Sequence, residues 1–374
     1  MAVVEALGAE NIKFVGGAVR DTLIGRKVMD IDAATRHLPE KTMALLKAGN
    51  IKVIPTGLKH GTVTAVHGKD TLEITTLRLD LETDGRHAEV AFTTEWLEDA
   101  KRRDFTFNAL YAAPDGALFD PFNGLGDLKA GRVVFIGDAE ARIEEDALRI
   151  MRFFRFFARY GVGKPDVEAV AACGAKLDML AGLSIERVRD ELLKLLEVPD
   201  PMPALRLMDE TGVLGAIVGA GATLTSCQRY IVSENGVVVN AFARFYFLLK
   251  STMTAREIAS RFKLSKKDAG RLVNMERAYS ALPLVDAKTV RRAIYNWGGE
   301  ATTAALMFEG ETSEGELLAI AQDWKAPEFP LKGRDLIKAG FEVGPQMGET
   351  LKALEMKWIE SDFTYTKSDL LSGL

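Results

Sequence analysis

The first 137 residues alternate short hydrophobic runs with glycine-rich or polar turns. An apolar run at 13–15 ends in two glycines, and a helical pattern follows at 18–24. Polar and apolar positions then alternate over 28–33, which predicts a strand with one polar face. The order of strand, glycine turn, helix and strand predicts a mixed α/β region at the start of the chain.

The remainder of this region gives further strand and turn signals. Apolar runs at 61–66 and 71–78 flank a short polar segment, which predicts a β-hairpin. A helix is predicted over 40–48. The segment 80–88 is polar and contains an Asp-Gly pair, so we predict a mobile loop there.

From about residue 139 a helical spacing of apolar positions dominates to the end of the chain. The predicted helices span 143–160, 167–179, 185–196 and 202–211. Segments rich in glycine or proline separate several of them. The sequence therefore predicts an α+β protein, with a mixed head over 1–137 and an all-helical arm after it.

The composition is that of an ordinary soluble globular protein, with 47% hydrophobic and 27% charged residues among 374. No apolar run reaches the roughly 18 residues of a membrane span, and the N-terminus lacks the pattern of a secretory signal. Cys173 and Cys227 lie far apart without metal-ligand spacing, which argues against a disulfide framework or a zinc site. We expect a cytoplasmic protein with no membrane partner.

The charge balance offers only local support for nucleic-acid binding. The net charge is −5, from 48 basic and 53 acidic residues, whereas nucleic-acid binders usually carry a basic surface. Residues 251–300 hold ten Lys and Arg against five acids, and 301–374 hold seven against thirteen. A basic stretch can bind phosphate locally, but solvated helix faces explain the same pattern.

Asp30 and Asp32 are the first candidates for chemistry. Two residues apart on a strand, they point the same way and repel each other unless a cation lies between them. Hard carboxylate ligands suit Mg²⁺, which usually shares its shell with water and substrate phosphates. Glu73 on a later strand could be a third ligand, although a surface position explains it equally. For the pair, a solvated strand edge is the competing interpretation.

Gly16 and Gly17 strengthen the nucleotide interpretation. Between a strand and a helix, glycines let backbone N–H groups approach phosphates closely. By itself a glycine pair is usually a tight turn. A glycine turn upstream of a paired-carboxylate strand suits a nucleotidyl-transfer site.

Five ordered motifs between about residues 12 and 196 resemble those of the class II CCA-adding enzymes and bacterial poly(A) polymerases. The residues that carry the resemblance are Gly16 to Asp21 with Leu23, Gly25, Arg26 and Asp30 to Asp32; Lys101 to Leu110; Asp120, Pro121, Gly124, Asp127 and Leu128; Glu145 to Arg149 with Arg152; and Ser184 to Glu191. Residues 84–87 resemble the flexible-loop segment of the family. Two later segments, 332–336 and 344–348, resemble a tail found in many bacterial members.

The resemblance implies an architecture and an activity. It implies a polymerase-β-like nucleotidyltransferase head over 1–137, a nucleotide-selecting neck over 138–196, a body over 197–285, and an RNA-binding tail over 286–374. The expected reaction joins nucleotides from CTP and ATP to the 3′ end of tRNA without a template. Two Mg²⁺ ions held by Asp30 and Asp32 are expected to assist attack of the RNA 3′-hydroxyl on the α-phosphorus and the loss of pyrophosphate.

Asp146 and Arg149 are the residues expected to select the base. Three apart on the predicted helix, they would share a face, and an ordinary helix ion pair is the alternative. As a protein template, the carboxylate accepts from the amino group of cytosine or adenine, and the guanidinium donates to ring acceptors. Guanine and uracil present a carbonyl instead, so they would leave polar groups unpaired.

The resemblance also assigns roles to neighbouring residues. The residues expected to bind the nucleotide are Gly16, Gly17, Arg20, Arg103, Asp146, Arg149 and Arg152. Arg20 could instead pair with Asp21. We expect Asp104 to order Arg103 or a nearby loop, and Glu191 with its neighbours Glu186 and Arg189 to brace the fourth motif. Four phenylalanines at 153, 154, 156 and 157 are assigned to the core rather than to base stacking.

Several other functions stay open at this stage. A poly(A) polymerase, a CC-only enzyme and an A-only enzyme share the motifs, although the short termini and acidic tail favour tRNA as the acceptor. The loop segment at 84–87 favours addition of the terminal A. A catalytically inactive RNA-binding protein and a small-molecule nucleotidyltransferase are the alternatives from other classes. The sequence carries no indication of the oligomeric state.

Overall fold

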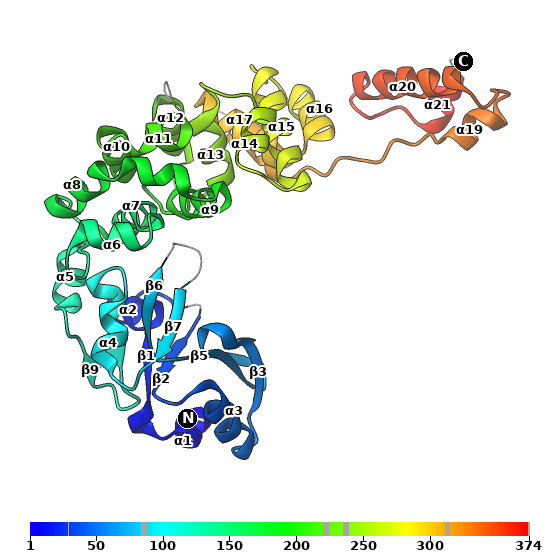
Figure 1. Cartoon of the computed structure of the whole chain (residues 1–374). Coiled ribbons are helices and arrows are strands. Elements are labelled where there is room, and N and C mark those ends of the chain that lie inside the picture. The colour runs from blue at the N-terminus through cyan, green and yellow to red at the C-terminus, as the bar shows by residue number, and fades with distance from the viewer. Residues whose placement is uncertain (29, 84–87, 220–223, 235–238, 311–314, 373–374) are drawn as a thin grey trace. The chain divides into compact units, whose positions relative to one another are not determined.

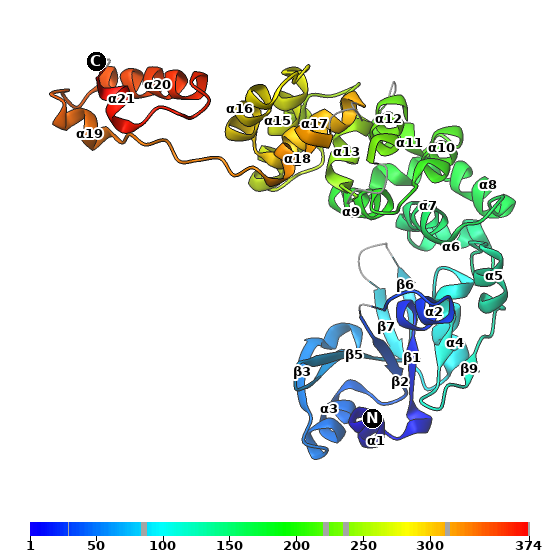
Figure 2. The ribbon, with the colours of Figure 1, turned by 180° about the vertical axis from the view of Figure 1, so that it is seen from behind.

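The computed structural model describes all residues except 29, 84–87, 220–223, 235–238, 311–314 and 373–374. The chain forms two compact units, Met1–Ala220 and Gly221–Leu374. Figure 1 and Figure 2 show the ribbon from opposite sides. The first unit contains the sheets that the sequence predicts and the first helices of the arm, which confirms a mixed head followed by helices.

A seven-stranded sheet forms the centre of the head, with the strand order β3-β4-β5-β2-β1-β8-β9. The strands are β1 (Ile12–Val15), β2 (Asp32–Thr35), β3 (Lys52–Gly57), β4 (Thr62–His67), β5 (Asp70–Thr76), β8 (Tyr111–Ala112) and β9 (Leu118–Phe119), and the separate hairpin consists of β6 (Arg78–Thr83) and β7 (Ala88–Phe92). Strand β2 pairs antiparallel with β1 and parallel with β5. The predicted hairpin around residue 68 is confirmed as β4–β5.

The two faces of this sheet are covered by different elements. The helices and 3₁₀ turns of the head are α1 (Ala2–Leu7), η1 (Ala9–Asn11), α2 (Gly17–Leu23), α3 (Pro39–Ala48), η2 (Leu58–His60), α4 (Trp96–Lys101), η3 (Thr106–Ala109) and α5 (Gly124–Ala130). Successive side chains of a strand point to opposite faces. Ala33 accordingly packs in the core under α1 and α3, and Ala34 packs in the core that includes Trp96 of α4.

Two predicted elements of the head are wrong. The strand expected over 28–33 begins only at Asp32, so Asp30 precedes it rather than sharing it. The loop expected over 80–88 is largely the hairpin β6–β7. Within 80–88, the segment 84–87, which resembles the family's flexible loop, lies outside the described residues.

Helices complete the first unit. They are α6 (Ala139–Glu145), α7 (Leu148–Tyr160), α8 (Val167–Ala175), η4 (Leu177–Gly182), α9 (Ile185–Leu196), α10 (Met202–Glu210) and α11 (Val213–Val218). Helix α9 has the predicted bounds. The single helix predicted over 143–160 is instead two helices, because Asp146 and Ala147 interrupt it.

The four phenylalanines of α7 are buried, as predicted. Phe153 and Phe156 pack against Phe105 from the head, with ring centroids 6.5 and 5.3 Å apart. Burying several aromatic rings in one cluster removes a large apolar area from water and so stabilises the packing. This cluster fixes α7 against the segment that carries the second motif.

All the regular elements in the described residues of the second unit are helices. Its helices are α12 (Leu224–Glu234), α13 (Ala241–Leu249), α14 (Ala255–Arg261), α15 (Lys266–Ser280), α16 (Ala287–Trp297), α17 (Gly299–Glu309), α18 (Gly315–Asp323), α19 (Gly333–Lys338), α20 (Pro345–Glu360) and α21 (Lys367–Leu371). One apolar core joins α16, α17 and α18, and another joins α19, α20 and α21. None of the helices in the described part of the chain has the length and apolar character needed to cross a bilayer.

Candidate active site

The glycine turn lies at one wall of a cavity in the first unit. Gly16 ends the loop after β1 with a φ of 68°, a left-handed conformation that suits glycine, and Gly17 begins α2. A Cβ atom at Gly16 would lie 3.8 Å from Nη1 of Arg103, and one at Gly17 would lie 3.6 Å from Nη2 of Arg20. Two guanidinium groups therefore flank half-buried main chain at the wall of the cavity, an arrangement that suits a phosphate chain.

Asp32 and Glu73 stand side by side at the start of the parallel pair β2–β5, where they are register partners. Burial raises the pKa of Asp32, the neighbouring carboxylates of Glu73 and Asp30 raise it further, and Arg103 opposes them. Asp32 therefore lies in the field of two other carboxylates, those of Glu73 and Asp30. A divalent cation bound at Asp32 would relieve this repulsion.

The protein supplies only part of a metal shell here. Among the described residues, no three His, Cys, Asp or Glu side chains lie close enough together to hold a metal ion on their own. Magnesium usually binds through one or two carboxylates and completes its shell with water and substrate phosphates. The donor set therefore fits a cation that arrives with a nucleotide better than a permanent structural metal.

The cavity brings all seven predicted nucleotide-binding residues together. It has a volume of about 580 Å³ and includes Gly16, Gly17, Asp32 and Asp146 in its wall. Its arginines are Arg20, Arg78, Arg102, Arg103, Arg149, Arg152, Arg155 and Arg187. Asp30 is not part of this wall. A smaller cavity of about 250 Å³ contains Glu73 and shares Asp32, Gly16 and two of the arginines.

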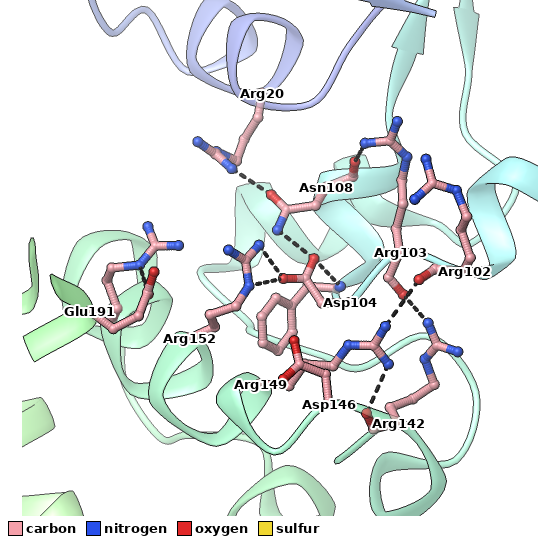
Figure 3. A network of polar contacts seen from close by, with 12 residues as sticks. Arg20, Arg102, Arg103, Asp104, Asn108, Arg142, Asp146, Arg149, Arg152 and Glu191 are labelled. Atoms are coloured by element: carbon pink, nitrogen blue, oxygen red, sulfur yellow. Dashed lines mark hydrogen bonds and ion pairs between the residues drawn. The ribbon is translucent and has the colours of Figure 1, made fainter. Parts of the chain in front are cut away.

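A series of side-chain hydrogen bonds connects α2 with α7 across one side of the cavity (Figure 3). Arg20 donates to Oδ1 of Asn108 at 2.5 Å, and Asn108 donates to Oδ1 of Asp104 at 2.8 Å. Arg152 donates to Oδ2 of Asp104 through Nε at 2.7 Å and lies 2.5 Å away through Nη2. Arg20 also pairs with Asp21 at 3.1 Å, which was one of its two expected partners.

The expected role of Asp104 is wrong in one respect. Asp104 is paired with Arg152, while Arg103 pairs with Asp99 of α4 at 3.2 Å. The charge of Arg152 holds the pKa of the buried Asp104 below its usual range, against the opposing effect of burial. Asp104 therefore connects the second motif to the fourth, and it also orders its own loop, as expected, by accepting from the Phe105 N–H at 2.9 Å and from Asn108 at 2.8 Å.

Asp146 and Arg149 do not share a helix face as expected. Asp146 lies in extended backbone at the end of α6, where its Oδ1 accepts the N–H of Leu148 at 3.0 Å. Its carboxylate is paired with Arg187 of α9 at 2.9 Å. Arg149 in α7 is paired with Glu145 at 2.6 Å. The simple ion pair between Asp146 and Arg149 is thus not formed, yet both side chains face the same cavity.

Main-chain carbonyls of the second motif hold two arginines of the helical neck (Figure 3). Arg149 Nη2 donates to the carbonyl oxygen of Arg102 at 3.2 Å, and Arg142 Nη2 donates to that of Arg103 at 2.8 Å. Glu145 lies 2.6 Å from both Arg142 and Arg149. Arg149, the candidate for base selection, is therefore anchored to the main chain of residues 102 and 103, whose side chains line the same cavity.

Sequence reasoning assigned no role to several of these partners. Glu145, Asn108 and Arg187 all lie inside the five motifs, but only the fold reveals which groups they contact. Arg187 is one of several charged residues near the start of α9, so helical spacing alone does not indicate that it faces Asp146. Glu191 was expected to brace the fourth motif, and it contacts Arg155 of α7 at 2.5 Å.

Comparison with known families matches two segments, both within the first unit. Residues 12–134 match the family described as "Poly A polymerase head domain". Residues 165–218 match the family described as "Probable RNA and SrmB- binding site of polymerase A". The first match spans the glycine turn, the carboxylates and the second motif, and the second begins just before α8.

Similar proteins extend the comparison to the whole chain. A protein of Mus musculus named "CCA tRNA nucleotidyltransferase 1, mitochondrial" is 36% identical, over 99% of this chain and 88% of that protein. A "CCA-adding enzyme" of Levilactobacillus brevis is 31% identical, over 100% and 96%. The crystal structure of a Bacillus stearothermophilus CCA-adding enzyme in complex with CTP matches with a TM-score of 0.81 and 29% identity, over 96% and 92% of the two chains.

Proposed function

Since this chain belongs to the class II CCA-adding enzyme family, we propose that it adds C, C and A to the 3′ end of tRNA. CTP and ATP are the proposed substrates and pyrophosphate the proposed product. The observation that carries the proposal is the cavity in which the glycine turn, Asp32, Asp146 and Arg149 meet under a wall of arginines. Such a site offers a place for phosphates, base and metal at once.

The proposed reaction forms one bond and breaks one bond. The oxygen of the RNA 3′-hydroxyl attacks the α-phosphorus, and the bond between that phosphorus and the oxygen bridging it to the β-phosphate breaks. Pyrophosphate leaves with the bridging oxygen, and the proton of the hydroxyl passes to water. The backbone at Gly16 and Gly17, with Arg20 and Arg103 beside it, is proposed to hold the phosphates. Arg152, fixed by Asp104, is proposed to contact the nucleotide from the neck side.

We propose magnesium as the metal of this metal-dependent family. Asp30 and Asp32 are the proposed ligands, and the register position of Glu73 beside Asp32 makes it the proposed third carboxylate. When bound, Mg²⁺ would lower the pKa of the attacking hydroxyl and neutralise charge on the leaving pyrophosphate. The carboxylates themselves contribute a negative, partly desolvated site that attracts the cation.

Base selection is proposed to rest on Asp146 and Arg149. Asp146 keeps acceptor positions for an amino group even while Arg187 and the Leu148 N–H bind it, because a carboxylate has about four lone-pair sites. Arg149 is oriented by Glu145 and by a main-chain carbonyl, which leaves it aimed rather than mobile. Guanine and uracil would place a carbonyl against the carboxylate and lose affinity.

The four-part division of the chain is part of the proposal. We propose that residues 1–137 catalyse, 138–196 select the nucleotide, and 197–285 and 286–374 form a body and an RNA-binding tail. We also propose the cytoplasm as the compartment, because Cys173 and Cys227 are both buried and unpaired. The relative from Mus musculus is named as mitochondrial, so fractionation of the source cell is the direct test.

A single set of transcripts tests the function. tRNA transcripts ending before the first C, the second C and the A are incubated with each nucleotide alone and with both, and the products are sequenced. Completion of all three transcripts to CCA is the expected result. Growth by C alone, by A alone or by a long run of A would identify the other members of this group, and an absence of transfer with retained CTP binding would indicate an inactive scaffold.

A further inference from the structure

Asp99 is a buried carboxylate that the proposed reaction does not use. It lies in α4 with 1% of its surface exposed. Its Oδ1 accepts from Nε and Nη2 of Arg102, at 2.9 and 2.8 Å, and from the N–H of Arg78 at 3.3 Å. Its Oδ2 accepts from the hydroxyl of Tyr111 at 2.6 Å and from Nη2 of Arg103 at 3.2 Å.

Arg103 is held by the same group of residues. Its Nε donates to the oxygen of Tyr111 at 3.0 Å, and its Nη1 donates to the carbonyl oxygen of Asn108 at 3.3 Å. The guanidinium also lies over the Tyr111 ring, 5.1 Å from the centroid. Of the five N–H groups of an arginine, three donate to these described residues, which leaves two for a ligand.

Both arginines face the place where phosphates are proposed to bind. Arg102 and Arg103 line the larger cavity and the smaller one, together with Gly16 and Asp32. Nη1 of Arg103 is the group nearest to a Cβ built on Gly16. Guanidinium groups with fixed planes recognise phosphate oxygens through paired hydrogen bonds, which a mobile arginine makes less well.

We propose that Asp99 is a positioning residue that aims Arg102 and Arg103 at the phosphates of the incoming nucleoside triphosphate. The inference rests on the proposed function and deepens it. Two adjacent arginines repel each other, and one carboxylate behind them offsets one of the two charges while it fixes both planes. The group keeps a net positive charge toward the cavity, and Tyr111 completes it as both a donor to Asp99 and an acceptor from Arg103.

The test separates phosphate positioning from general damage. In the full-length protein with Mg²⁺, dissociation constants of CTP, CDP and CMP are measured for the wild type and for Asp99→Asn. We expect CTP binding to weaken by about tenfold, the size of a lost charged hydrogen bond, while CMP binding changes by less than about twofold. With tRNA as the acceptor, KM for CTP should rise while kcat is largely retained.

Two further variants make the result decisive. Glu98→Gln changes the neighbouring acid of α4, which is partly exposed and pairs with Lys101 at 2.7 Å, and should leave all three constants unchanged. Tyr111→Phe keeps both ion pairs of Asp99 and removes one hydroxyl, so CTP binding should weaken by about threefold. If Asp99→Asn does not fold, Tyr111→Phe decides.

Equal losses for CTP and CMP, or unchanged CTP binding, would overturn the positioning role. A wild-type protein that transfers nothing to RNA would instead refute the proposed function. The comparison of CTP with CMP would still decide what Asp99 does, because it requires binding alone.

Discussion

At the scale of single residues, Asp32 lies in surroundings that disfavour its negative charge. Burial and the nearby carboxylates raise its pKa in the folded chain above the ordinary value of 3.8. A raised carboxyl pKa means that the folded state binds protons more readily than the unfolded state. The contribution of Asp32 to stability is therefore greatest below its unfolded pKa and is lost as the pH rises through the folded pKa.

Because ionised Asp32 is disfavoured in the folded state, we make a prediction for Asp32→Asn. The variant should lose nucleotide transfer, as should Asp30→Ala, while RNA binding persists. At pH 7 without metal, its melting temperature should be higher than that of the wild type by about 1 °C, because repulsion is removed. Differential scanning fluorimetry at pH 7 and pH 4 checks this, since the difference should shrink at the lower pH. A melting temperature below the wild-type value at pH 7 would contradict the argument.

A second residue-scale prediction concerns nucleotide choice. Asp146→Ala removes the acceptor for the amino group of cytosine and adenine, so discrimination against UTP and GTP should fall by about tenfold or more. The ratio of kcat/KM for CTP to that for UTP measures it. Asp115→Ala, on an exposed loop of the head, serves as the control and should keep the original ratio. Unchanged exclusion of UTP by Asp146→Ala would refute the template role.

At the scale of elements, α7 and α9 are joined by a buried ion pair. Arg155 and Glu191 lie 2.5 Å apart, with 14% and 7% of their side chains exposed. Arg155 also lies over the ring of Phe156, 4.1 Å from its centroid. Removing one partner of such a pair leaves the other charged and poorly solvated, which costs more than the pair itself contributes.

We therefore predict that Glu191→Ala destabilises the packing of α7 on α9 by about 3 kcal/mol. The double variant Arg155→Met with Glu191→Leu should recover most of this loss, because apolar side chains of similar volume replace both charges. Hydrogen exchange of the backbone amides in the two helices measures the effect where it occurs. A double variant as unstable as Glu191→Ala would show that the ion pair itself stabilises the packing.

Hydrophobic spacing predicted many elements but missed the breaks made by polar side chains. Helix α9 was predicted with its observed bounds, because its apolar positions and flanking turns agree. The break at Asp146 was missed, since the apolar pattern continues across it while the side chain binds the Leu148 N–H and replaces a helical bond. The hairpin β6–β7 was missed because its polar residues and its Asp-Gly pair resemble a loop.

The candidate site was predictable as a set of motifs but not as a set of contacts. The resemblance pointed to the glycine turn, the arginines and Asp146, and the fold brings them to one cavity. Which partner each charge takes depends on elements far apart in the chain, such as Asp104 with Arg152 and Asp146 with Arg187. Spacing along one helix carries no information about such pairs.

At the scale of the whole molecule, the net charge of −5 does not describe the surface that a nucleotide meets. Eight arginines line the cavity, against Asp32, Asp104 and Asp146. An anion is attracted by the local field, which a partly desolvated cavity strengthens, rather than by the total charge of the chain. The acidic balance therefore does not argue against a phosphate-binding function.

The two-unit organisation gives a prediction for a shortened chain. Every residue proposed to contact the nucleotide lies within Met1–Ala220, which has its own cores. A fragment that ends at Gly219 should fold and bind CTP within about threefold of the full chain, whereas its affinity for tRNA should fall by about tenfold or more as phosphate contacts are lost. Equilibrium CTP binding and a filter-binding assay with tRNA measure the two effects.

The matching control is the separate fragment that begins at Leu224. It should retain helical circular dichroism and bind no CTP. Loss of CTP binding by the first fragment, with its fold intact, would place part of the nucleotide site beyond residue 219.

The carbonyl oxygens of Arg102 and Arg103 that hold Arg149 and Arg142 have an evolutionary consequence. Every amino acid carries a peptide oxygen, so no point mutation at 102 or 103 deletes these acceptors directly. Inserting or deleting a residue nearby would shift both at once. Homologues of this protein should therefore keep the number of residues between positions 99 and 104 constant, even where many side chains vary. A homologue with an insertion or deletion in this segment is expected to have lost its nucleotide selectivity.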